Sequence, residues 1–153
     1  MPTGPELDAL LNTPDSALKT TNTINKAQVQ GWIREAGRKH DDAQRKANTG
    51  STRLDAAYDA VFFCALAALA SEGLRVTSRA GHHETGLRAA ALVMKLPAAL
   101  HDEADALKDW RNRKYQGFFD PSDDDIKDAI ATARHYMEAT SAWLQREKPE
   151  LLK

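Results

Sequence analysis

An uninterrupted apolar run from Ala60 to Ala70 constrains the fold more than any other feature of this sequence. Upstream of the run, Leu54, Ala57 and Tyr58 continue one apolar face at helical spacing, and Gly73 follows it as a helix-ending residue. A helix that is apolar on nearly all sides leaves no face for water, so other elements must surround it. The run is too short for the roughly 18–20 residues of a membrane-spanning helix. We therefore expect a buried central helix inside a bundle, and no membrane span.

The segments around this helix are amphipathic. Each has apolar residues at intervals of three or four, with charged residues on the remaining faces. No segment alternates apolar and polar residues over the length of a strand, and β-branched residues are scarce in the periodic regions. The sequence therefore predicts an all-α protein, an up-and-down helical bundle of about five helices. The expected helices are 26–47, 52–72, 84–96, 98–115 and 122–146.

Two of these helices begin with the spacing of a capping box, in which two side chains three residues apart bond each other's backbone. Thr52 is followed by Asp55 after the predicted turn 48–51, and Ser122 is followed by Asp125. Both pairs predict a helix start at the first residue of the pair.

The length and the cysteine content limit the domain organisation. A chain of 153 residues fits a single domain with one hydrophobic core. Residues 1–25 contain three of the six prolines, so we expect a loosely ordered N-terminal arm with one short helical turn, followed by the bundle over 26–153. Cys64, the single cysteine, lies within the apolar run, where we expect an inert core residue. One cysteine excludes an intramolecular disulfide and fits a reducing compartment.

The net charge of −1 conceals an uneven distribution. Residues 19–50 hold seven Lys/Arg against three Asp/Glu, whereas residues 100–153 hold nine against twelve. A near-neutral chain is not held on DNA or on a membrane by bulk charge, so contact with a polyanion has to come from a local patch. The opposite charges of the two regions can steer a homodimer or a complex with a partner protein. The other explanation, which is the commoner one, is that they form solvated helix faces. The N-terminus has no pattern of a secretory signal, and we expect a cytoplasmic protein.

The densest polar cluster is the segment 108–116, at the end of a predicted helix. Arg111 and Tyr115 are four residues apart, and Lys108 and Arg111 three apart, so the members of each pair share a helix face. Guanidinium, phenol and amide groups held together suit a phosphate oxygen of RNA or of a nucleotide. The other explanation is that the cations complement the helix dipole and pair with nearby acids. Besides Arg111, the candidate residues of this segment are Lys108, Asn112, Arg113, Lys114, Tyr115 and Gln116.

Three features of the chain together resemble the HEPN superfamily. A helix ends in Arg111-Asn112-x-x-Tyr115, a short turn and an acidic-capped last helix follow it, and the upstream apolar helix begins Leu-Asp-Ala-Ala-Tyr-Asp-Ala. The resemblance extends over about residues 26–144. It implies a small helical bundle, often a homodimer, and ribonuclease activity of the kind found in toxin–antitoxin and phage-defence systems. It also implies that Arg111 and Asn112 are the motif's Arg and Asn, with Tyr115 and Gln116 as further catalytic candidates.

The histidine of the family motif has no match in this chain. The family's activity relies on an Arg followed after four to six residues by His, whereas those positions here hold Gln116, Gly117 and Phe118. Metal-independent RNA cleavage needs a group that takes the 2′-hydroxyl proton, which imidazole does well near neutral pH and glutamine cannot do. A tyrosine, with an ordinary pKa of about 10, is a poor base at neutral pH.

His82 and His83 are ligand-binding candidates and the nearest source of an imidazole. Three roles are open to these histidines. They can pack or cap at the start of the following helix, they can bind a metal together with Glu84 and His101, or one of them can reach Arg111 in the folded chain. Neighbouring residues on a helix point about 100° apart and rarely share one ion, so we expect no metal and no cofactor.

These features lead to two hypotheses about function. The first is a HEPN-like protein with an RNA- or nucleotide-related role, either a metal-independent endoribonuclease or a non-catalytic RNA-associated module. The second is a non-catalytic helical scaffold that binds partner proteins. The two differ in whether Arg111, Asn112, Tyr115 and a histidine converge on one cleft.

Overall fold

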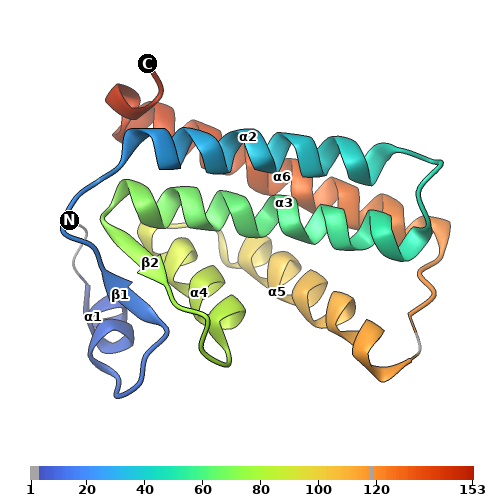
Figure 1. Ribbon diagram of the computed structural model, residues 1–153, viewed down its shortest axis with the longest axis horizontal. Helices are drawn as coiled ribbons and strands as arrows, with labels where there is room; N and C mark the ends of the chain where they lie inside the picture. The colour runs from blue at the N-terminus through green and yellow to red at the C-terminus, as the bar shows by residue number, and fades with distance from the viewer. Residues whose placement is uncertain (1–3, 118) are drawn as a thin grey trace.

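The computed structural model describes residues 4–117 and 119–153, and its architecture is predominantly helical (Figure 1). The all-α prediction is confirmed. The regular structure of the described residues consists of six α-helices, two short 3₁₀ helices and one two-stranded sheet. The α-helices are α1 (Pro5–Asn12), α2 (Lys26–Gln44), α3 (Gly50–Ser71), α4 (His82–Met94), α5 (Ala98–Asn112) and α6 (Asp123–Glu147). The 3₁₀ helices are η1 (Arg113–Gln116) and η2 (Pro149–Leu151).

The central helix of the bundle is α3, as the apolar run predicts. Helices α2 and α6 run along α3 on one side, and α4 and α5 cover its other side (Figure 1). Small side chains such as Ala65 and Ala68 are fully buried, which lets the neighbouring helices approach closely. Cys64 is buried in the core, as predicted, and burial raises the pKa of its thiol to about 12.

The length and hydropathy of α3 would allow it to cross a membrane. However, 78% of its most apolar 18-residue window is buried inside the protein. Burial against the other helices therefore accounts for its apolar surface.

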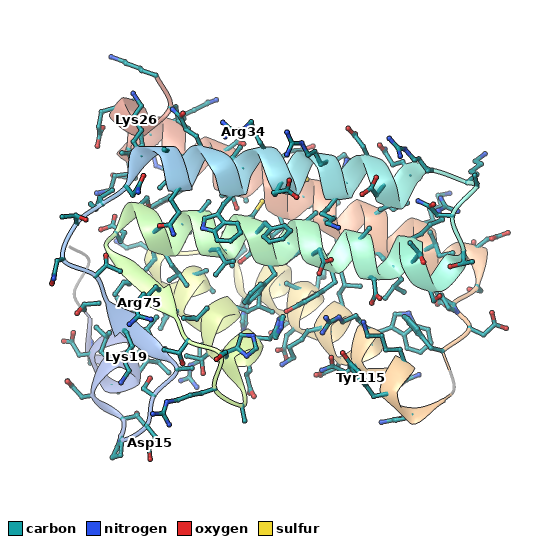
Figure 2. All side chains as sticks on the ribbon, viewed as in Figure 1. Asp15, Lys19, Lys26, Arg34, Arg75 and Tyr115 are labelled. Atoms are coloured by element: carbon teal, nitrogen blue, oxygen red, sulfur yellow. The ribbon has the colours of Figure 1, made fainter. Side chains whose placement is uncertain are left out.

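The N-terminal segment contains more regular structure than the sequence predicts. The expected helical turn is the eight-residue helix α1, and β1 (Leu18–Thr20) pairs antiparallel with β2 (Leu74–Val76). The segment 74–83, expected to be a loop or helix entry, thus begins with a strand. Leu18 and Leu74 are fully buried, whereas Lys19 and Arg75 lie opposite each other on the ribbon (Figure 2). Strands of three residues are too short to show an alternating pattern, so the sequence does not reveal them.

One of the two expected capping boxes is wrong and the other is confirmed. Helix α3 starts at Gly50, and the residue that caps it is Thr49, whose side-chain oxygen accepts from the Thr52 backbone N–H at 3.3 Å. Ser122 and Asp125 form the reciprocal pair at the start of α6, with bonds of 3.1 and 2.9 Å. The Thr52–Asp55 box does not form because α3 already begins at Gly50, which places Thr52 inside the helix. The Asp55 carboxylate pairs instead with Arg111 and Lys114.

Other helices also begin or end at residues that differ from the predicted ones. Helix α2 ends at Gln44, three residues before the predicted end. Helix α4 starts at His82 rather than Glu84, after Gly81 in the left-handed conformation with φ 79°. The helix expected over 98–115 is divided into α5 and η1. The predicted site residues 113–116 therefore lie in a 3₁₀ helix, which winds more tightly than an α-helix.

Candidate functional site

Three polar side chains interrupt the apolar surface of α3 on one face. Asp55, Tyr58 and Asp59 are spaced three and four residues apart, which places them together on the helix. Tyr58 is fully buried, and Asp55 and Asp59 are partly exposed. Burial raises the pKa of Asp59 above its ordinary value, and the nearby Lys39 opposes this effect. This face provides the surface on which the polar segment after α5 docks.

Arg111 and Lys114 reach this face from the end of α5 and from η1. The Lys114 ammonium donates to Asp55 Oδ2 at 3.0 Å. Arg111 Nε lies 3.6 Å from Asp55 Oδ1, and the Arg111 guanidinium lies 5.1 Å from the centre of the Tyr58 ring, in a cation–π arrangement. Both Arg111 Nε and Asp55 Oδ1 are buried and lack a hydrogen-bond partner in the described part of the chain. Such groups are rare in folded proteins and are often found at functional sites.

His83 completes the group from the start of α4. Its Nδ1 is 2.7 Å from the Tyr58 hydroxyl oxygen. Partial burial lowers the pKa of His83 to about 4, and the positive charges of His82, Arg111 and Lys108 add to this effect. The imidazole is therefore neutral at physiological pH. Burial also raises the pKa of Tyr58, so its hydroxyl stays protonated. We call Asp55, Tyr58, His83, Arg111 and Lys114 the Arg111 cluster.

Lys108 lies one turn before Arg111 on α5 and is 7% exposed. Its ammonium donates to Asp105 Oδ1 at 2.8 Å and lies 3.6 Å from Asp109 Oδ1. Burial alone would lower the pKa of Lys108, but the hydrogen bond and the charge of Asp105 raise it above the ordinary value. Lys108 is thus held by its own helix, and it influences the Arg111 cluster only by its charge.

The remaining predicted site residues lie outside the Arg111 cluster. Tyr115 is 75% exposed at the outer edge of η1 (Figure 2), with the Lys114 ammonium 5.2 Å from its ring. Gln116 is exposed beside it. The Arg113 guanidinium stacks 4.4 Å from the centre of the Trp110 ring, on a different side of α5.

Two candidates lie next to the cluster without joining it. Asn112 is exposed, and its Oδ1 accepts from Arg111 at 3.2 Å. The His82 ring lies against His83, with centroids 4.3 Å apart, and its Nδ1 is 3.0 Å from the Arg79 carbonyl oxygen. Of the nine candidates named from the sequence, the structure brings together Arg111, Lys114 and His83.

The sequence reasoning missed the contribution of α3. Asp55 does not form the predicted cap and instead pairs with Arg111 and Lys114. Tyr58 lies in the core, as predicted, but its ring also contacts the Arg111 guanidinium. The available signal was an aspartate, a tyrosine and a second aspartate on one face of a helix that is otherwise apolar. Within the described residues, His, Cys, Asp and Glu side chains form no group of three that could hold a metal ion.

Comparisons with known proteins identify no relative of this chain. No protein-family model, no curated protein and no solved structure matches the chain.

Proposed function

We propose that this protein is a HEPN-like protein that binds RNA phosphate at the Arg111 cluster. The observation that carries the proposal is the meeting of Arg111, Lys114 and a neutral histidine on one face of α3, from three separate elements. Arg111 and Lys114 carry two positive charges against the one negative charge of Asp55, and the remaining positive charge attracts a phosphodiester, which carries a single negative charge. A guanidinium can contact two of the phosphate oxygens. Asp55 holds both cations before RNA binds, and a phosphate competes with it for their N–H groups.

We further propose that His83 takes the role of the histidine that the motif lacks. In the tautomer whose Nδ1–H donates to the Tyr58 oxygen, Nε2 keeps a lone pair and can accept the proton of a ribose 2′-hydroxyl. The 2′-oxygen then attacks phosphorus, the bond to the 5′-oxygen breaks, and the departing oxygen takes a proton from solvent. Arg111 lowers the barrier by stabilising the charge that develops on the phosphoryl oxygens.

The competing function is a scaffold in which the cluster only joins α3 to α5. The contacts of Asp55 with Arg111 and Lys114 favour this alternative, because they satisfy part of the charge without a ligand. RNA binding distinguishes the two functions, since a structural ion pair has no need of a polyanion.

The binding test is fluorescence anisotropy with a labelled single-stranded RNA over a range of salt concentrations, in the presence of EDTA. We expect Arg111→Ala to weaken binding by about tenfold and to reduce the slope of log K against log salt by about 1, because one phosphate contact is lost. Arg134→Ala, which removes an exposed arginine on α6, is the matched control and should bind as the wild type does. Circular dichroism establishes that each variant is folded.

Unchanged RNA affinity in folded Arg111→Ala would contradict the binding proposal, as would the absence of RNA binding by the wild-type protein.

Cleavage is followed on the same RNA by gel electrophoresis. We expect products in EDTA from the wild type and none from His83→Asn, which keeps a polar partner for Tyr58 but cannot take up a proton. RNA binding without products would leave the protein a binding module and refute the role of His83.

A further inference from the structure

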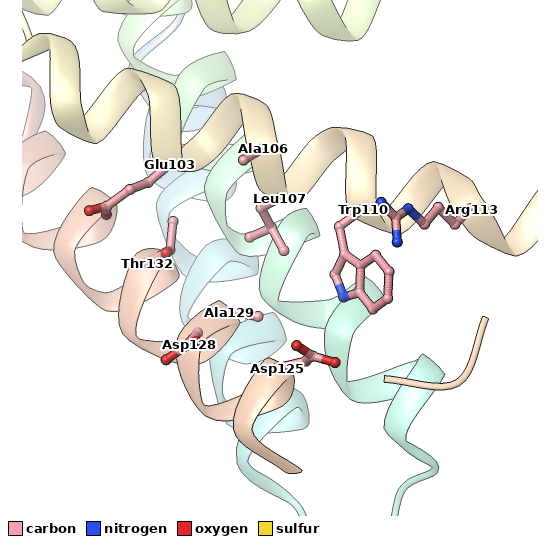
Figure 3. A pocket seen from close by; sticks show the side chains of 9 residues that line it. All are labelled: Glu103, Ala106, Leu107, Trp110, Arg113, Asp125, Asp128, Ala129 and Thr132. Atoms are coloured by element: carbon pink, nitrogen blue, oxygen red, sulfur yellow. The ribbon is translucent and has the colours of Figure 1, made fainter. Parts of the chain in front are cut away.

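A groove lies between α5 and α6 (Figure 3), and no residue of the Arg111 cluster lines it. Its cavity volume is about 470 Å³, within the range of small-molecule sites. Leu107 and Ala129, which are buried, contribute to its apolar lining, and Trp110 lines it at the end near η1. The lining residues recur at intervals of three and four on each helix, so two helical stripes face each other across the groove.

The charged residues of the groove are separated along its length. Glu103 of α5 and Asp128 of α6 lie toward one end, and Arg113 lies at the other, beyond Trp110 (Figure 3). Both acidic residues are exposed, and neither side chain has a hydrogen bond or salt bridge among residues 4–117 and 119–153. Seven residues separate Glu103 from Trp110, about 10 Å along a helix. The groove therefore suits an elongated molecule that has a cationic group at one end and an anionic group at the other.

The Trp110 end also contains an unsatisfied donor. The indole Nε1 is buried and has no hydrogen-bond partner in the described part of the chain, and it lies on the edge of the ring turned toward Asp125 in Figure 3. Asp125 Oδ2 already accepts from the Ser122 backbone, which leaves Oδ1 for a further donor. This end of the groove thus matches the two charged groups of a free amino acid. The indole N–H and the Arg113 guanidinium suit its carboxylate, and the Asp125 oxygen suits its ammonium.

We propose that this groove binds a free basic amino acid, arginine or lysine. The α-carboxylate contacts Arg113 and the Trp110 N–H, and the α-ammonium contacts Asp125. The apolar part of the side chain packs on Leu107 and Ala129, and its cationic end lies between Glu103 and Asp128. This site is separate from the Arg111 cluster, and the proposal does not depend on RNA binding.

Three matched probes test the two ends of the site by isothermal titration calorimetry. L-Arginine carries both the guanidinium and the α-carboxylate. Citrulline replaces the guanidinium by a neutral ureido group, and agmatine lacks the carboxylate. We expect a Kd for arginine of about 1 mM or tighter. We expect both analogues to bind about tenfold more weakly, since each loses a charge-assisted contact. Absence of arginine binding, or equal affinity for the three probes, would overturn the proposal.

Variants of the two ends make the test specific to this groove. The double variant Glu103→Gln, Asp128→Asn should lose the preference for arginine over citrulline, and Arg113→Gln should lose the preference for arginine over agmatine. Glu138→Gln, which neutralises an exposed carboxylate elsewhere on α6, should keep both preferences. If the double variant still prefers arginine over citrulline, the acidic end is not the site of the guanidinium. If Arg113→Gln still prefers arginine over agmatine, the orientation is wrong.

Discussion

Partial burial keeps the imidazole of His83 neutral, and the nearby positive charges of His82, Arg111 and Lys108 add to this effect. A positive charge on His83 would be placed near Arg111 and Lys108 and partly removed from water, and each of these factors disfavours protonation. His83 is therefore an uncharged neighbour of Arg111 at physiological pH, as the proposed proton transfer requires.

We expect this depressed pKa to make the protein less stable in acid. His83 in the folded state takes up a proton only near pH 4, whereas the unfolded chain takes it up near the ordinary value of about 6.5. Between these pH values the unfolded state binds more protons, so the stabilising contribution is complete above about pH 6.5 and is lost as the pH falls toward 4. Urea unfolding at pH 7 and pH 4.5 measures the effect as the loss of unfolding free energy.

His83→Asn should lose less unfolding free energy between these two pH values than the wild type does. His135→Asn, at an exposed position on α6, is the control and should lose as much as the wild type. An equal loss in His83→Asn and the wild type would show that His83 does not titrate abnormally.

At the scale of the element, two glycines inside helices have opposite surroundings. A Cβ on Gly37 of α2 would meet no atom within 4 Å, whereas a Cβ on Gly86 of α4 would lie 3.1 Å from Phe62 Cε1 and 3.4 Å from Val76 Cγ1. Gly86 thus permits the close packing of α4 on α3 and on the ribbon, while Gly37 has no such role.

We expect Gly37→Ala to raise the free energy of unfolding by about 0.5–1 kcal/mol, because alanine loses less backbone entropy in a helix. Gly86→Ala should lower it by about 1 kcal/mol, because Phe62 is buried and has little room to move. Thermal or urea unfolding of the two variants measures both changes. A stabilising Gly86→Ala would show that the contact between α3 and α4 adjusts without cost.

The parts of the fold that depend on neighbouring residues could be predicted from the sequence, and the parts that depend on contacts between distant segments could not. The α3 core and the Ser122 cap follow from periodicity and from side chains that act within one turn. The β1–β2 pairing depends on residues far apart in the sequence, and the end of α5 at Asn112 depends on the docking of η1 on α3. Arg111 was identified as a candidate from its neighbours on α5, but Asp55 and Tyr58 become site residues only through tertiary contacts.

At the scale of the whole molecule, the chain end folds back onto the bundle. Leu151 in η2 is buried with Val29, Ala67 and Ala70, and the Gln30 side chain donates to its carbonyl oxygen at 3.0 Å. A satellite core thus joins α2, α3 and the C-terminal residues.

We expect Leu151→Ala to lower the free energy of unfolding by about 2 kcal/mol, since it empties part of this satellite core. The adjacent Leu152 is 36% exposed, and Leu152→Ala should change stability by less than about 0.5 kcal/mol. Urea unfolding of the two variants gives a matched comparison. Equal effects would mean that the end of the chain contributes no packing.

The β1–β2 ribbon has a consequence for the order in which the chain assembles. It joins the residues before α2 to the residues after α3, and these two helices lie antiparallel with a short turn between them (Figure 1). Contacts between neighbouring segments form faster than contacts between distant ones. We therefore expect the α2–α3 hairpin to form first and the ribbon to close after it. During synthesis, β1 is made before α2, α3 and β2, so its pairing with β2 must wait until both helices have been made.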